Sequence, residues 1–174
     1  MHLQAVVYRA HDPRWAWTPL SGQGARRRGG RFNRVGLAAM YMSFSLATAV
    51  REVSPIGRRM QPLVLCEYEV DADPVFDALD PAARAEQSVG QEELDCPDWR
   101  NDMFSGRVAA SQALADRLID AGFAGMRFRS YALGAGAQDV NLVLWRWGRE
   151  LPSRVVLIDE DNRLGRGRPN PLGD

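Results

Sequence analysis

Residues 29–52 contain, close together in the sequence, the groups that chemistry on a nucleotide requires. Gly29 and Gly30 lack side-chain bulk, so the main chain can approach a ligand closely there or adopt a positive φ angle. Arg31 follows, and a guanidinium can bind a pyrophosphate through two parallel hydrogen bonds. Tyr41 offers a flat ring to a planar base, and the carboxylate of Glu52 can bind ribose hydroxyls and stabilise positive charge at an anomeric carbon. This set suits a site that holds a dinucleotide and breaks a glycosidic bond in it.

The position of Glu52 favours a functional role. The apolar spacing predicts a helix over residues 46–53, and Glu52 falls in its last turn. A carboxylate there faces the negative end of the helix dipole, at a cost of about 0.3–1 kcal/mol. A local preference broken in this way is typical of functional positions. The alternative is a solvated glutamate paired with Arg51 or Arg58.

Three further polar residues are candidate ligand contacts. Arg9 lies near the end of the first predicted strand and could bind phosphate beside Arg31. Ser130 precedes a glycine-rich segment, where it could hydrogen-bond a ligand or cap a turn. Asn141 begins a late strand and is a candidate binding residue, with a turn residue as the simpler interpretation. The glycine-rich loop has neither P-loop nor Gly-x-Gly-x-x-Gly spacing, so these residues must act through another arrangement.

The elements that would position these residues predict an α+β domain with a mixed β-sheet core and a few short helices. Ser45 is a good N-cap for the helix at 46–53. A catalytic domain is expected over residues 1–158, with a mobile tail at 159–174. The pattern predicts strands at 4–10, 37–43, 62–71, 125–129, 141–147 and 154–158, a loop at 21–30, and helices at 108–121, 82–88 and 92–94.

Composition excludes several classes of protein. The chain has 174 residues, 45% hydrophobic and 25% charged, as expected for one globular domain. No apolar run is long enough to cross a bilayer, and no signal peptide is recognised at the N-terminus. Two cysteines make a poor disulfide framework and favour the cytoplasm. Two histidines without clustered partners make a metal site unexpected.

Charge is strongly segregated although the net charge is zero. Residues 1–60 contain ten arginines and two acidic residues, whereas residues 61–104 contain twelve acidic residues and two arginines. The basic part could attract an anionic ligand or a nucleic acid, and the acidic part could dock a basic partner. A non-enzymatic nucleic-acid-binding module is therefore one alternative function, although no helix-turn-helix or basic helix carries these arginines. Two solvated faces of one domain are the other interpretation.

In combination, these motifs resemble the RES-domain family over residues 5–150. The resemblance is carried by Tyr8-Arg9, the run Gly-Gly-Arg-Phe-Asn-x-x-Gly, Ala-Met-Tyr-Met-Ser before Glu52, and two later segments at 129–130 and 141–145. Members of this family are toxins of bacterial toxin–antitoxin modules, whose partner is a helix-turn-helix antitoxin of the Xre type. The resemblance implies a fold like that of ADP-ribosyltransferase toxins, with NAD as the substrate.

The resemblance also assigns residues and a reaction. The arginine, glutamate and serine of the family name map onto Arg31, Glu52 and Ser130, and two further residues map onto Arg9 and Tyr41. The expected reaction cleaves the nicotinamide–ribose bond of NAD and transfers ADP-ribose, with a protein acceptor favoured. A phosphorylase or glycohydrolase that depletes NAD is the alternative. The antitoxin is expected to occlude the site, and nucleic acid to be contacted only through the antitoxin.

Overall fold

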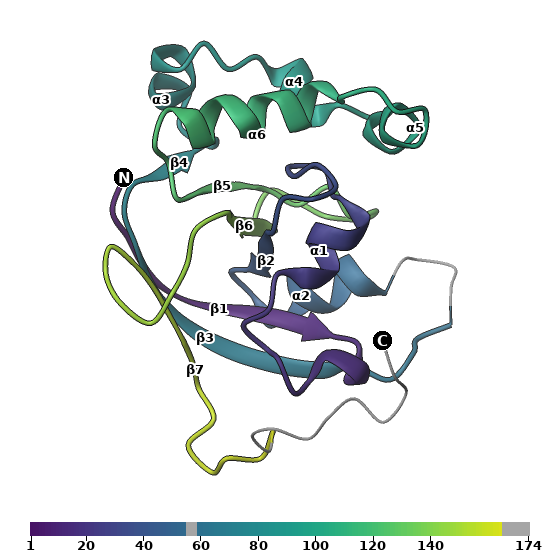
Figure 1. Cartoon of the computed structure of the whole chain (residues 1–174), viewed down its shortest axis with the longest axis vertical. Helices are drawn as coiled ribbons and strands as arrows, with labels where there is room; N and C mark the ends of the chain where they lie inside the picture. The colour runs from purple at the N-terminus through teal and green to yellow at the C-terminus, as the bar shows by residue number, and fades with distance from the viewer. Residues whose placement is uncertain (55–58, 165–174) are drawn as a thin grey trace.

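The computed structural model describes residues 1–54 and 59–164 (Figure 1). Its centre is a seven-stranded sheet with the strand order β4-β5-β6-β2-β1-β3-β7. Neighbouring strands are antiparallel except β4 and β5, which are parallel. The strands are β1 (Leu3–His11), β2 (Met40–Ser43), β3 (Val64–Ala72), β4 (Val75–Asp77), β5 (Gly125–Arg129), β6 (Val140–Leu144) and β7 (Ser153–Leu157).

Short helices cover this sheet, which confirms the predicted α+β class. In Figure 1, α3, α4, α5 and α6 gather along one side of the molecule, whereas α1 and α2 lie near β2 and β1. The helices are the 3-10 turn η1 (Pro13–Trp15), α1 (Gln23–Arg28), α2 (Leu46–Val53), α3 (Pro81–Glu86), α4 (Gln91–Asp95), α5 (Trp99–Phe104) and α6 (Ala110–Asp120).

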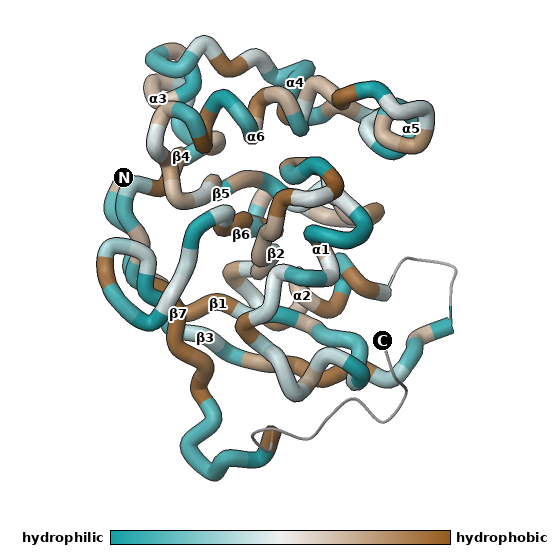
Figure 2. The backbone as a smooth tube through the Cα atoms, viewed as in Figure 1, coloured by the Kyte–Doolittle hydropathy of each residue, from teal (hydrophilic) through white to brown (hydrophobic). Residues whose placement is uncertain are grey.

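Two hydrophobic cores lie on opposite faces of the sheet. Leu114 of α6 packs in one core with Met126 and Val143. Val7 and Leu142 belong to the other core. The neighbours Leu142 and Val143 thus point in opposite directions, as the two-residue period of a strand requires. Along α6, hydrophobic and hydrophilic residues alternate, as expected for a helix with one buried side (Figure 2).

The pairing between β1 and β2 is very short. Tyr8 and Ser43 are the one registered pair between these strands among the described residues. Beyond Tyr8, β1 continues to His11 along β3, while β2 pairs with β6. The sheet therefore opens between the C-terminal half of β1 and the N-terminal half of β2, and this opening positions the candidate site.

Most predicted elements are confirmed, with small shifts at their ends. The helix at 46–53 coincides with α2, and Ser45 Oγ accepts a hydrogen bond from the Thr48 amide at 3.1 Å as its N-cap. The predicted loop at 21–30 is wrong at its centre, where one alanine and three arginines form most of α1. Helix α5 was not predicted.

Two further expectations, the end of α2 and the C-terminal tail, concern residues outside the described structure. In the sequence, Pro55 and Gly57 predict the end of the helix at 46–53, and both residues lie outside the described ones. Of the predicted tail, residues 165–174 also lie outside them. Within the described parts of the chain, no helix combines the length and the hydropathy needed to cross a membrane.

Candidate active site

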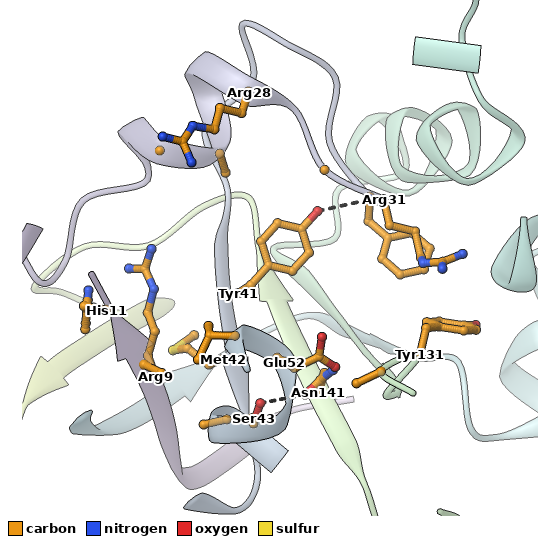
Figure 3. A pocket seen from close by; sticks show the side chains of 18 of the residues that line it. Arg9, His11, Arg28, Arg31, Tyr41, Met42, Ser43, Glu52, Tyr131 and Asn141 are labelled. Carbon is orange, nitrogen blue, oxygen red and sulfur yellow. Dashed lines mark hydrogen bonds between the residues drawn. The ribbon is translucent and has the colours of Figure 1, made fainter. Parts of the chain in front are cut away.

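A cavity of about 630 Å³ lies at the opening between β1 and β2. Figure 3 shows Tyr41 near its centre, with Arg9 and His11 on one side and Arg31 and Tyr131 on the other. Ser130 is not among the lining residues but contacts one of them, Glu52. The predicted site residues that line the cavity are Arg9, Gly29, Gly30, Arg31, Tyr41, Glu52 and Asn141.

The Glu52 carboxylate is held in a defined orientation. Its Oε1 accepts hydrogen bonds from Ser130 Oγ at 2.6 Å and from Asn141 Nδ2 at 2.5 Å. Ser43 Oγ donates to Asn141 Oδ1 at 2.7 Å, which turns the amide N–H of Asn141 toward Glu52. These two donors offset the unfavourable position of the carboxylate in the last turn of α2. Within residues 1–54 and 59–164, no group donates to Glu52 Oε2, so this oxygen is available to a ligand.

Arg31 is anchored on one edge and open on the other. Its Nη1 donates to the carbonyl oxygen of Asp95 and, at 3.1 Å, to that of Cys96, where α4 ends. The ring centroid of Tyr131 lies 4.0 Å from the guanidinium carbon, a cation–π contact. Burial lowers the pKa of Arg31, yet an arginine stays charged in a protein. No described residue accepts from Nε or Nη2, so these groups can bind an anion.

Arg9 lies at the opposite side of the cavity. Its Nη1 donates to the carbonyl oxygens of Pro19 at 3.1 Å and Ser21 at 3.2 Å. Beside it, His11 Nε2 lies 2.6 Å from the Tyr68 hydroxyl oxygen, and the hydrogen of that hydroxyl is donated to the carbonyl oxygen of Pro19 at 3.0 Å. Burial, and then the charge of Arg9, lower the pKa of His11 to about 4, so this histidine is neutral at pH 7. Arg9 therefore supplies the positive charge on this side.

The two glycines shape a tight turn beside Tyr41. Gly29 ends α1 with a φ angle of 71°, a conformation that favours glycine. A Cβ on Gly30 would lie 2.6 Å from Asn33 Oδ1 and 2.7 Å from the Tyr41 hydroxyl. That hydroxyl donates to Asn33 Oδ1 at 2.9 Å and accepts from the Phe32 amide at 3.0 Å. Burial raises the pKa of Tyr41, which keeps the hydroxyl protonated as a donor. The turn holds Arg31 next to the Tyr41 ring.

Positive charge predominates in the lining of the cavity. Five arginines line it, at positions 9, 28, 31, 51 and 100, against the acidic residues Asp12 and Glu52. Asp12 is paired with Arg14 at 2.6 Å, and Arg51 is paired with Asp139. The remaining arginines favour an anionic ligand in the cavity. Over the described residues, no group of three His, Cys, Asp or Glu side chains is arranged to hold a metal ion.

Several lining residues were not predicted as site residues. Arg28 ends the arginine run of α1, and that run could have been assigned to the cavity had α1 been predicted. Tyr131 directly follows the candidate residue Ser130, and this adjacency in the sequence could have marked it as a site residue. Trp99 and Arg100 come from α5, a helix that the sequence pattern did not indicate. His11 and Ser43 are ordinary strand residues in sequence and acquire their place only from the sheet register.

The fold and the site define a small α+β domain with an arginine-rich cavity built around one oriented carboxylate. The chain belongs to the RES domain family, whose model matches residues 6–165. One similar solved structure is a chain in the crystal structure of the M. tuberculosis MbcT–MbcA toxin–antitoxin complex, with 22% identity and a TM-score of 0.61. The match covers 91% of this chain and 84% of that chain, and at this identity it shows a shared fold. A comparison with curated proteins gave no match.

Proposed function

We propose that this chain is the toxin of a bacterial toxin–antitoxin module and that it cleaves the nicotinamide–ribose bond of NAD. The observation that carries the proposal is the Glu52 carboxylate, fixed by Ser130 and Asn141 and facing a cavity rich in arginine. Two findings support it: the chain belongs to the RES domain family, and it shares its fold with a chain in the crystal structure of a toxin–antitoxin complex.

The chemistry of NAD matches what this site can supply. When the glycosidic C–N bond breaks, its electron pair moves to the cationic nicotinamide, which leaves as a neutral molecule. No strong acid is needed for that departure. Positive charge develops at the anomeric carbon of the ribose, and a fixed carboxylate lowers the energy of that state. Glu52 Oε2 is the oxygen with no donor among the described residues, so it is the atom assigned to the ribose.

The arginines and Tyr41 are assigned to binding and orientation. Arg31 can offer Nε and Nη2 to a pyrophosphate oxygen pair, because only Nη1 is used within the described protein. Arg9 supplies a second guanidinium across the cavity. Tyr41 presents its ring rather than its hydroxyl, since the hydroxyl is engaged by Asn33 and Phe32. Stacking on nicotinamide or its ribose is therefore the role proposed for Tyr41.

The ADP-ribose acceptor is proposed to be a protein. Helix α4, whose Asp95 carbonyl oxygen accepts from the cavity residue Arg31, carries the exposed acidic residues Glu92 and Asp95, and these side chains suit a basic acceptor. Transfer to phosphate or water is the second candidate. Arg28 and Arg100 favour phosphate as the acceptor, because both line the cavity and neither is assigned to the pyrophosphate of NAD.

The acceptor is tested by incubating the chain with NAD labelled in the adenylate part, with and without cell extract. Labelled protein identifies a transferase. Nicotinamide release that requires added phosphate identifies a phosphorylase, and release in its absence a glycohydrolase. Binding to DNA or RNA that weakens steeply with salt, without any NAD consumption, would instead support the nucleic-acid-binding alternative.

The partner is proposed to be a helix-turn-helix antitoxin that covers the cavity between the Gly29–Gly30 turn and α2. Support comes from the toxin–antitoxin complex that shares this fold. A stoichiometric complex with such an antitoxin is expected to lose NAD turnover, measured as nicotinamide release. Full turnover by the complex would refute occlusion of the cavity, although the toxin assignment would remain.

A further inference from the structure

One connection, between β5 and β6, touches both functional groups of the site. It runs from Ser130 to Asp139. Its first residue donates from Oγ to Glu52 at 2.6 Å. Its second residue, Tyr131, places its ring 4.0 Å from the guanidinium carbon of Arg31. Two consecutive residues of this loop thus contact the carboxylate and the anion-binding arginine.

The far end of the same loop is fastened to α2 through Asp139. Thr48 Oγ1 donates to Asp139 Oδ1 at 2.7 Å, and Arg51 forms an ion pair with the same oxygen. The other oxygen, Oδ2, accepts from the Gly136 amide at 2.8 Å. The Asp139 carbonyl accepts from the Ser130 amide at 2.8 Å, which closes the base of the loop. Asp139 therefore joins the helix that carries Glu52 to the loop that carries Ser130.

We propose that Asp139 is a positioning residue, whose carboxylate anchors the loop 130–139 to α2 and so fixes Ser130 on Glu52 and Tyr131 beneath Arg31. The side chain of Asp139 is 15% exposed and lies outside the cavity lining, so it acts through these neighbours. The catalytic part of this inference rests on the proposed function. Through Ser130 and Tyr131, the Asp139 carboxylate thus supports the orientation of both Glu52 and Arg31.

Asp139→Ala is the direct test, with Asp77→Ala as a matched control. Asp77 is also a half-buried carboxylate: it pairs with Arg127 at 3.1 Å, accepts a backbone amide hydrogen bond at 3.0 Å, and is 17% exposed. We expect Asp139→Ala to lower kcat for nicotinamide release by about 10- to 100-fold, because small misplacements of catalytic groups are that costly. KM for NAD should rise as well, since Arg31 loses part of its support. Asp77→Ala should change neither.

A double-mutant cycle separates positioning from a merely structural role. In a Ser130→Ala background, Asp139→Ala should lower kcat by less than about twofold further, because the residue it positions is gone. KM for NAD should still rise in the double variant, because Tyr131 no longer supports Arg31 when Asp139 is absent. Losses in kcat that multiply in the double variant, equal losses in Asp77→Ala, or an unchanged Asp139→Ala enzyme would overturn the proposal.

Amide hydrogen exchange keeps this test independent of NAD chemistry. Asp139→Ala should speed exchange of the amides at residues 130–132, and Asp77→Ala should not. If the wild-type chain does not turn over NAD, the proposed function fails. Amide exchange at residues 130–132 then still tests whether Asp139 anchors the loop 130–139. Unchanged exchange at 130–132 would overturn the positioning role in either case.

Discussion

Arg31 shows how a single side chain can be anchored and yet remain free to bind. One of its nitrogens satisfies two carbonyl groups at the end of α4, and its flat face lies against Tyr131. Only a planar guanidinium can make these contacts and still present a second pair of N–H groups in a fixed plane. Its planar geometry, in addition to its charge, is therefore what the proposed pyrophosphate contact requires.

Replacing Arg31 with lysine should weaken NAD binding while leaving the fold intact. A lysine keeps the charge but loses the fork and the stacking, so we expect KM for NAD to rise about ten- to a hundredfold. Steady-state kinetics of nicotinamide release measure this. Arg34→Lys is the control, because Arg34 pairs with Asp116 at 2.9 Å outside the cavity. Equal KM values for Arg31→Lys and wild type would remove the pyrophosphate role from Arg31.

At the scale of single residues, the sequence predicted Glu52 as a site residue but not the side chains that hold it in place. Glu52 was a candidate because a carboxylate in the last turn of a helix is unfavourable, and the structure provides the compensation. Ser130 and Asn141 were candidates for ligand contacts, and the structure gives both a contact with Glu52. They lie 78 and 89 positions from Glu52 along the chain, a separation that no local pattern bridges. Direct contact of either residue with NAD stays a prediction.

At the scale of elements, the sequence predicted the bounds of some helices and strands correctly. Helix α2 and strand β5 have their predicted bounds. The glycines around the arginine run of α1 indicate a loop, but the arginines themselves form helices readily. Helix α5 has no buried residue, so no apolar pattern marked it. The loop 130–139 depends on Asp139 meeting Thr48 and Arg51, a contact between distant segments.

At the scale of the whole molecule, the basic first third of the sequence supplies most of the cavity arginines, whereas the acidic middle segment supplies one, Arg100. Arg9, Arg28 and Arg31, from the basic first third, line the cavity. The acidic middle segment forms β3, β4 and the helices α3–α5. The position of the cavity itself follows from the short pairing of β1 with β2, which depends on the complete strand order and was not predictable from any one segment.

The buried histidine beside Arg9 should make the folded protein sensitive to acid. The pKa of His11 falls from 6.5 to about 4 in the folded state, mainly through burial. The unfolded chain therefore takes up the proton first, and stability is lost as the pH falls from 6.5 toward 4. We expect this residue to contribute a loss of about 2 kcal/mol between about pH 7 and pH 5.

His11→Gln isolates this contribution, since glutamine can still hydrogen-bond the Tyr68 hydroxyl but does not titrate. Urea unfolding of both proteins at the two pH values gives the free energies of unfolding. The variant should lose less stability on acidification than the wild type. Parallel losses in the two proteins would show that His11 is not the group responsible.

The central claim is that Glu52 stabilises positive charge on the ribose while the nicotinamide of NAD leaves. The most direct measurement is nicotinamide release from NAD by the wild-type chain and by Glu52→Gln, with phosphate and cell extract supplied as acceptors. We expect release by the wild type and a loss of about 100- to 1,000-fold in the variant, by analogy with the removal of one electrostatic stabiliser. Thermal unfolding checks that the variant is folded. A folded Glu52→Gln variant with wild-type turnover, or a wild-type chain that releases no nicotinamide with any acceptor, would contradict the account.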